Sequence, residues 1–340
     1  MKNYKANKST SEFLKGVHAS AKQDHCILCG KRIDSTCNSH VVPKFVLKEI
    51  AEDGMISYGH IFHKLKVPGV EKTTGINNAY TFRLICKDCD KKVFRDYENP
   101  ENILNFDSFS PQLQKQILCQ MSLKAHLSHC QTKYNRLISK DIATGGKAHE
   151  LEEQGILTPE RIDLIEHFEY IDAIRKSEKT NKNPFRILYN NLLNYKTDFA
   201  TQTVICFIYD LKGRKIFDPN NLSLDNKCSY FYLMILPVKN HTRILFYTEE
   251  KWTWRVETLI KQFEDLSEDD KLHFLFVSLI VHDQEFYVRP SKAKEIIKND
   301  KKLIRLYSCT DQRFYWPFDN RKKIAKFKKY NNYLLERTLK

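Results

Sequence analysis

The sequence predicts an α+β fold made of a small N-terminal unit bounded by cysteines and a larger mixed domain. Two Cys-x-x-Cys pairs lie near the ends of the first unit. Beyond it, apolar residues recur with a helical period, and from about residue 200 runs of β-branched and aromatic residues follow. We therefore expect a polar lead-in at 1–23, a cysteine-bounded domain at 24–104 and an α+β domain at 105–340. The last of these should be helical at first and strand-rich from about 200.

The larger domain should contain helices, then strands, then further helices. Apolar residues between Ile117 and Leu127 recur with a helical period, and Thr158 before Pro159 has the N-cap pattern of a helix start. The Lys239–His241 segment has the composition of a hairpin turn. The predicted strands are Thr203–Leu211, Tyr230–Pro237 and Arg243–Tyr247, and the later helices are Trp254–Leu266 and Lys271–Val281.

Composition and cysteine usage bear on the compartment. The longest largely apolar run, Leu272–Val281, is shorter than the roughly 18 residues of a membrane span, and the lysine-rich N-terminus lacks the apolar core of a signal peptide. We expect a cytoplasmic protein without a membrane partner. In a reducing compartment, metal binding explains clustered cysteines, and burial explains the scattered Cys119, Cys130, Cys206, Cys228 and Cys309.

Positive charge is concentrated at the two ends of the chain. The formal net charge is +14; residues 1–104 carry +5, residues 105–300 are neutral and residues 301–340 carry +9. Clustered positive charge attracts polyanions, of which nucleic acid is the most common. The alternative is a lysine-rich surface that is merely solvated.

The C-terminal segment Arg321–Lys340 combines this charge with an amphipathic pattern. Its apolar residues lie along one side of a predicted helix and are Ile324, Phe327, Leu334 and Leu335. A basic amphipathic helix binds nucleic acid, an anionic membrane or a partner, and we favour nucleic acid. The candidate contacts are Lys322, Lys323 and Lys326. The alternative is a docked terminal helix whose basic face is solvated.

The two cysteine pairs predict a structural zinc site. Cys26 and Cys29 are separated by 56 residues from Cys86 and Cys89. Zinc takes four thiolates in a tetrahedron, and two such turns complete its shell, while Gly30 permits the tight turn of a zinc knuckle. A redox role would require a thioredoxin-like context, which neither pair has. With four protein ligands the zinc would be closed and not itself catalytic.

Three motifs in order resemble the HNH, or ββα-metal, endonucleases. They are CILCG, SHVVPKF and LICKDCD, and they lie within residues 24–100. The chain is most similar to a subgroup, many from bacteria and phages, with paired zinc knuckles and Ser-His in place of Asp-His. The resemblance implies a zinc-stabilised ββα-metal domain at residues 24–104 and a role in cutting nucleic acid.

The resemblance also implies roles for individual residues. His40 would be the general base and, with Asp90, would hold a catalytic divalent ion, Mg²⁺ or Mn²⁺. Ser39 stands where the family usually has an acidic metal ligand, and Asn78, or its neighbour Asn77, would take the family's asparagine role. Basic side chains near the motifs would contact phosphates; these are Lys44, Lys91 and Arg95.

The expected function is therefore metal-dependent hydrolysis of DNA, with a role against phage or mobile DNA by analogy to the subgroup. Two alternatives remain open. One is an inactive zinc module that binds nucleic acid or a protein, since Ser39 replaces a carboxylate. The other is a toxin-like nuclease that cuts RNA. Residues 105–340 carry no motif tied to chemistry and would provide a scaffold or a surface for a protein partner.

Overall fold

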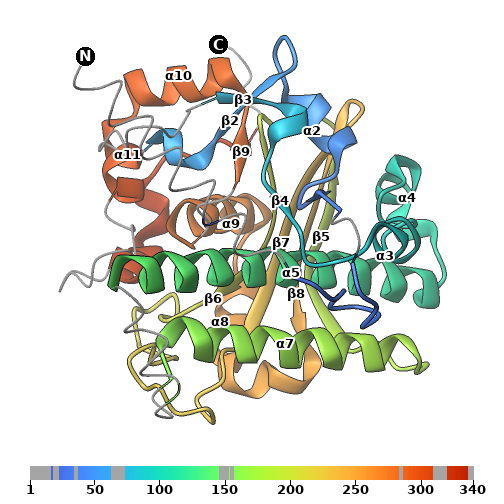
Figure 1. The fold of residues 1–340 in the computed structure, drawn as a ribbon. Coiled ribbons are helices and arrows are strands. Elements are labelled where there is room, and N and C mark those ends of the chain that lie inside the picture. The colour runs from blue at the N-terminus through green and yellow to red at the C-terminus, as the bar shows by residue number, and fades with distance from the viewer. Residues whose placement is uncertain are drawn as a thin grey trace, which may run out of the picture.

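The computed structural model describes residues 17, 23–33, 37–62, 73–144, 153, 157–282, 286–308 and 320–335. It is a mixed α+β structure built around a seven-stranded antiparallel sheet (Figure 1) with the strand order β3-β2-β9-β6-β7-β8-β5. The long strands are β5 (Phe185–Leu193), β6 (Phe199–Cys206), β7 (Tyr230–Val238) and β8 (His241–Glu249). The short strands are β2 (Met55–Tyr58), β3 (Thr73–Gly75) and β9 (Tyr287–Val288).

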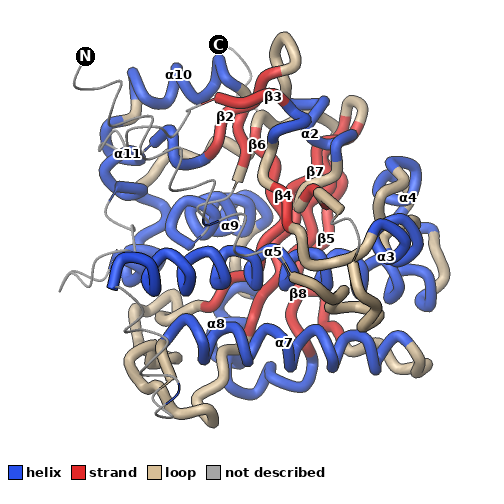
Figure 2. The backbone as a smooth tube through the Cα atoms, in the orientation of Figure 1, coloured by secondary structure: helices blue, strands red, loops and turns tan. Residues whose placement is uncertain are grey.

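Helices cover both faces of this sheet (Figure 2). On one face lie α5 (Pro111–Thr144) and α7 (Pro159–Glu178); on the other lie α8 (Thr253–Glu264), α9 (Glu268–His282), α10 (Pro290–Asn299), α11 (Lys301–Ser308) and the 3₁₀ helix η5 (Asn320–Lys329). Side chains of β7 alternate between the two cores: Tyr232 and Met234 face α5, whereas Leu233 and Ile235 face α9. Because both faces are buried, β7 reads as an uninterrupted apolar run.

The strand predictions are confirmed in part. The hairpin of β7 and β8 turns at Lys239, which has a φ of 53°. The strand expected at Thr203–Leu211 begins and ends earlier, because the Asp210 carboxylate accepts hydrogen bonds from the backbone of Lys212 and Arg214 and closes a turn there. Strand β5 was not expected, since its sequence mixes polar and apolar residues as suits the edge of a sheet.

The sheet connects the two predicted domains. Strands β2 and β3 come from residues 24–104, yet β2 pairs with β9 from the C-terminal part, with Ser57 opposite Val288. The Tyr97 hydroxyl also donates a hydrogen bond to Gln202 of β6. Strands from both sides of residue 104 therefore belong to the same sheet.

The C-terminal segment differs from the predicted helix. Residues Asn320–Lys329 form the 3₁₀ helix η5, with a kink at Lys326, and no helix continues through residue 335. The amphipathic pattern still has the expected effect: Ile324, Phe327 and Leu334 are buried. Residues 336–340 lie outside the described part. None of the helices that the structure describes has the length and apolar character needed to cross a membrane.

One prediction about the cysteines is wrong. Cys206 and Cys228, expected to be buried thiols, form a disulfide with a Cα–Cα distance of 6.0 Å. The reason is the strand register: Cys206 at the end of β6 pairs with Tyr230, and Cys228 lies only two residues before that partner. Cys119 and Cys130 are buried free thiols as expected, and Cys309 lies outside the described residues.

Candidate zinc centre and adjoining polar site

Two backbone turns bring the four expected zinc ligands together. In the first, the backbone N–H of Gly30 donates to the Cys26 carbonyl at 2.8 Å, and Gly30 has a φ of +70°, which favours glycine. In the second, Cys86 is the N-cap of α3 (Lys87–Val93) and Cys89 lies in its first turn. Both cysteines of the second pair therefore belong to the start of this helix.

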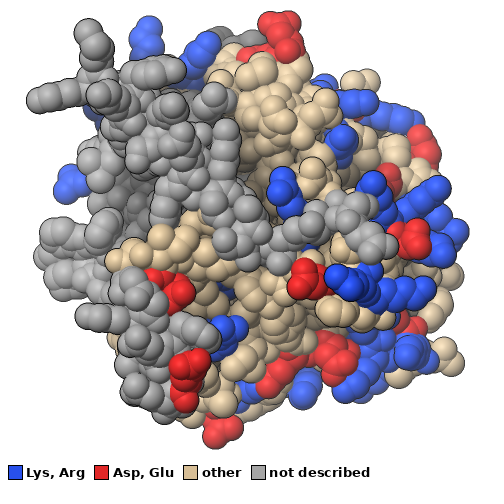
Figure 3. Space-filling model, viewed as in Figure 1, with Lys and Arg blue, Asp and Glu red and all other residues tan. Residues whose placement is uncertain are grey.

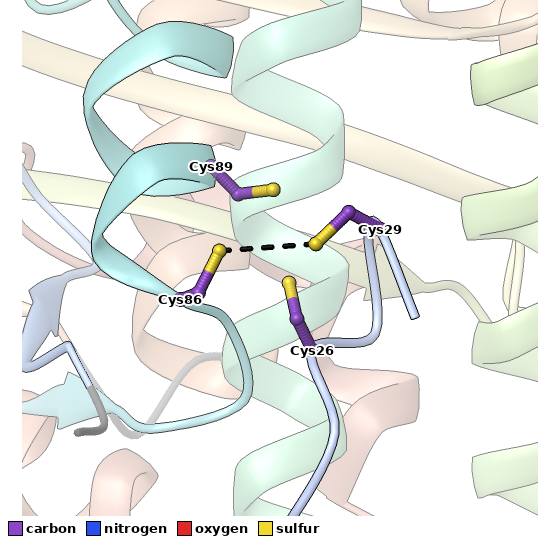
Figure 4. Close-up of side chains that lie close together, drawn as sticks. All are labelled: Cys26, Cys29, Cys86 and Cys89. Carbon is purple, nitrogen blue, oxygen red and sulfur yellow. Dashed lines mark hydrogen bonds between the residues drawn. The ribbon is translucent and has the colours of Figure 1, made fainter. Parts of the chain in front are cut away.

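The sulfur geometry fits one tetrahedral metal ion. The four Sγ atoms of Cys26, Cys29, Cys86 and Cys89 lie within 4.8 Å of one another and point toward a common centre (Figure 4). The Cys29 and Cys86 sulfurs are 3.8 Å apart, and a tetrahedron with zinc–sulfur bonds of about 2.3 Å has edges of about 3.8 Å. A hydrogen bond from the backbone of Lys31 lowers the pKa of the Cys29 thiol to about 7. This donor set suits Zn²⁺.

The four clustered cysteines lie beside a small polar site. The short strands β1 (Ser39–His40) and β4 (Thr81–Phe82) pair antiparallel, with His40 opposite Thr81, and α3 follows β4. The buried hydroxyl of Ser39 donates a hydrogen bond to one oxygen of Asp90. The Cys37 thiol donates to the other oxygen at 3.2 Å. The structure thus brings Ser39 and Asp90 into contact as the motif order indicated, and adds Cys37, which no spacing rule singled out.

His40 has a defined tautomer. Its Nε2 lies 3.2 Å from the carbonyl oxygen of Ile76. A carbonyl oxygen can only accept, so Nε2 carries the proton and the lone pair of the neutral ring lies on Nδ1. Burial lowers the pKa of His40 more than any other effect. The hydrogen bond to the Ile76 carbonyl and the charge of Asp90 act in the opposite direction, while the charge of Lys44 lowers the pKa further. His40 is therefore neutral at pH 7, with its Nδ1 available to accept a proton.

The asparagine segment lies beside His40 in the 3₁₀ helix η2 (Ile76–Asn78). The side chain of Asn77 accepts a hydrogen bond at 3.2 Å from Lys44, the first residue of α2 (Lys44–Ile50). For Asn78 the contact is through the backbone, where its carbonyl accepts from the Tyr58 hydroxyl at 3.1 Å. The segment holds His40 through the Ile76 carbonyl and not through an asparagine side chain.

A buried lysine behind the site was missed from the sequence. Lys124 of α5 has a side chain only 1% exposed, and its ammonium forms an ion pair with Glu98. The ammonium also lies 4.7 Å from the ring centre of Phe94. Helix α3 ends at Val93, and Glu98 follows in a turn. Ordinary helical spacing gave no signal that Lys124 would be buried here.

Apart from Lys44, whose ammonium donates to Asn77, the expected phosphate contacts fall into two separate groups. Lys91 and Arg95 are exposed on α3 and the turn that follows, and Arg95 pairs with Asp96 at 3.3 Å. Lysine and arginine side chains gather on this side of the molecule, where α3 and α4 (Pro100–Leu104) lie (Figure 3). By contrast, Lys322, Lys323 and Lys326 belong to η5, which packs on α9 at the other face of the sheet.

Comparison with known proteins adds no assignment. No family model, curated protein or solved structure matches this chain.

Proposed function

We propose that this protein is a metal-dependent endonuclease that hydrolyses phosphodiester bonds in DNA. His40 would act as the general base and Asp90 as the protein ligand of the catalytic ion. The observation that carries the proposal is the hydrogen bond between Ser39 and Asp90. It joins Ser39, the residue before His40 on β1, to α3, whose start carries Cys86 and Cys89. The candidate base and the carboxylate are therefore linked through neighbouring backbone positions, and the charge of Asp90 acts on the pKa of His40.

The tautomer of His40 suits a general base. With the Nε2 proton held by the Ile76 carbonyl, the free lone pair on Nδ1 can take a proton from an attacking water. The lowered pKa keeps this lone pair available near neutral pH. The Ile76 carbonyl also fixes the direction of the ring, so that a proton taken at Nδ1 leaves an imidazolium stabilised by the same hydrogen bond.

Asp90 suits a metal ligand of oxygen-preferring type. Each of its carboxylate oxygens accepts one hydrogen bond, from Ser39 and from Cys37, and each oxygen keeps a second lone pair. A bound Mg²⁺ or Mn²⁺ would supply the charge that neutralises the scissile phosphate. Ser39 then orients the carboxylate instead of replacing it as a ligand.

A second candidate is a zinc module that binds nucleic acid without cutting it. The observation in its favour is the same pair of hydrogen bonds, since Ser39 and Cys37 already engage both oxygens of Asp90. A divalent ion would have to share or displace them. Cleavage and binding therefore need to be measured separately.

The test incubates purified protein with supercoiled plasmid DNA, and separately with RNA, in Mg²⁺ or Mn²⁺. His40→Ala and Asp90→Ala are compared with His241→Ala in the β7–β8 hairpin and Asp225→Ala on an exposed loop. We expect the wild type and both controls to nick DNA, and the two site variants to lose activity by about 100-fold or more.

Zinc content measured by elemental analysis should be the same in all five proteins, because none of the substitutions removes one of the four candidate zinc ligands. DNA binding without cleavage, unchanged in His40→Ala and Asp90→Ala, would reject the enzyme in favour of the binding module. Cleavage of RNA but not DNA would reject the proposed substrate.

A further inference from the structure

Positive charge is concentrated in α11 and η5. Together these two elements, Lys301–Ser308 and Asn320–Lys329, contain nine Lys and Arg and no Asp or Glu. The exposed cations are Lys301, Lys302 and Arg305 on α11 and Lys322, Lys326, Lys328 and Lys329 on η5. We call these seven residues the C-terminal basic surface.

The surface is held rigidly because its underside is part of the core. Leu303, Leu306 and Tyr307 of α11 and Ile324 and Phe327 of η5 are all at most 5% exposed. They pack in the same apolar cluster as α8 and α9. The charged side chains therefore extend from a fixed base and do not belong to a loose tail.

Two contacts fix α11 and η5 relative to each other. Buried Asp300 accepts a hydrogen bond from the backbone of Leu303 at 2.9 Å and from the Asn331 side chain at 2.6 Å, so it joins the start of α11 to the segment after η5. The Lys302 ammonium donates to the Lys329 carbonyl. These contacts hold the start of α11 beside the end of η5, so the cations of the two elements keep a fixed position relative to each other.

Neighbouring acidic groups do little to neutralise this surface among the described residues. Asp270 pairs with Lys328 at 2.6 Å, and the Asp300 carboxylate is buried and engaged by its hydrogen bonds. Elsewhere in the described chain exposed cations often have an acidic partner, as Lys140 has Glu160 and Lys261 has Glu257. The excess positive charge is therefore directed to solvent, where it can meet an external polyanion.

We propose that the C-terminal basic surface binds the phosphate backbone of duplex DNA without reading its sequence, at a place separate from the site at His40 and Asp90. In Figure 1, α10 and α11 lie on the flank of the molecule away from α3. A row of lysines on a rigid base suits the closely spaced charges of a duplex, which carries one charge per about 1.7 Å of its axis. This binding surface extends the proposed function. The choice of DNA as the polyanion rests on that proposed function.

The test measures binding of a short, mixed-sequence DNA duplex to the full-length protein by fluorescence anisotropy over a range of salt concentrations, without added Mg²⁺ or Mn²⁺. One triple variant, Lys301→Gln, Arg305→Gln and Lys329→Gln, removes three charges from the surface. A control variant, Lys140→Gln, Lys176→Gln and Lys261→Gln, removes three exposed charges elsewhere. Neither set includes a residue of the candidate catalytic site.

Each neutralised phosphate contributes about −0.9 to the slope of log K against log salt concentration. The surface variant should therefore bind more weakly, with a slope shallower by about 2.7, whereas the control should keep the wild-type slope. Equal slopes in the two triple variants overturn the inference. The inference is also overturned if the wild type binds phosphatidylserine vesicles but does not bind the duplex.

Cleavage is measured in parallel to keep the two proposals apart. His40→Ala should bind the duplex with the wild-type slope while losing cleavage. If the wild type binds through this surface but cuts nothing in Mg²⁺ or Mn²⁺, the proposed nuclease fails and the binding surface stands. If cleavage depends on His40 and the surface variant binds like the control, the surface fails and the nuclease stands.

Discussion

Removal of the Glu98 carboxylate should destabilise the protein more than removal of the lysine with which it pairs. The Lys124 ammonium is almost fully buried, whereas 38% of the Glu98 side chain is exposed. Loss of one partner from a buried ion pair costs about 3–5 kcal/mol, because the other charge is left uncompensated. The ring of Phe94, 4.7 Å from the ammonium, offsets up to about 2 kcal/mol of this. With Glu98 partly screened by water, we expect Glu98→Gln to cost about 1–3 kcal/mol.

The opposite change should cost little. Lys124→Met keeps most of the volume, removes the buried charge and leaves Glu98 able to hydrate, so its effect should be within about 1 kcal/mol. The double variant should then be more stable than Glu98→Gln alone.

Urea unfolding followed by circular dichroism at pH 7 measures all four proteins of this cycle. The reasoning is refuted if Lys124→Met costs as much as Glu98→Gln, or if the double variant loses the sum of the two.

Two further predictions concern the zinc and a buried acid. Cys86→Ser should abolish zinc binding by elemental analysis and lower the melting temperature, whereas the control Cys119→Ala should keep its zinc; normal melting with full zinc in Cys86→Ser contradicts the site. Burial raises the pKa of Glu166 to about 8, so the native state holds a proton that the unfolded state releases above about pH 4.5. The contribution of Glu166 to the free energy of unfolding is therefore fully present at low pH. It falls by about 1.4 kcal/mol per pH unit as the pH rises toward 8. Glu166→Gln should flatten that decline in urea unfolding between pH 5 and 8, and an unchanged slope would refute it.

Local patterns predicted those parts of the fold that depend on neighbours in sequence. The N-cap Thr158 accepts a hydrogen bond from the backbone of Arg161, as its position before Pro159 indicated. The β7–β8 hairpin also follows its turn residues. The edge strand β5 was not predicted because Arg186, Asn190 and Asn191 interrupt its apolar residues, and its pairing with β8 is what makes it a strand.

The candidate site shows the same division. The spacing of the cysteines was enough to anticipate their cluster, because each Cys-x-x-Cys turn positions its own two sulfurs. The contact of Cys37 with Asp90 and the burial of Lys124 depend instead on how α3 packs against β1 and α5. Such contacts join residues far apart in sequence, and no periodicity encodes them.

The sequence by itself determined the four-cysteine cluster, the order of the motifs around it and the excess of positive charge at the C-terminus. Only the tertiary structure decided that β2 extends the large sheet, that Ser39 and Asp90 meet, and that Cys206 bonds to Cys228. The physical reason is that charge and metal-ligand spacing are properties of a short stretch of chain. Pairing, burial and hydrogen bonding between distant side chains exist only once the sheet and its two helical layers have packed.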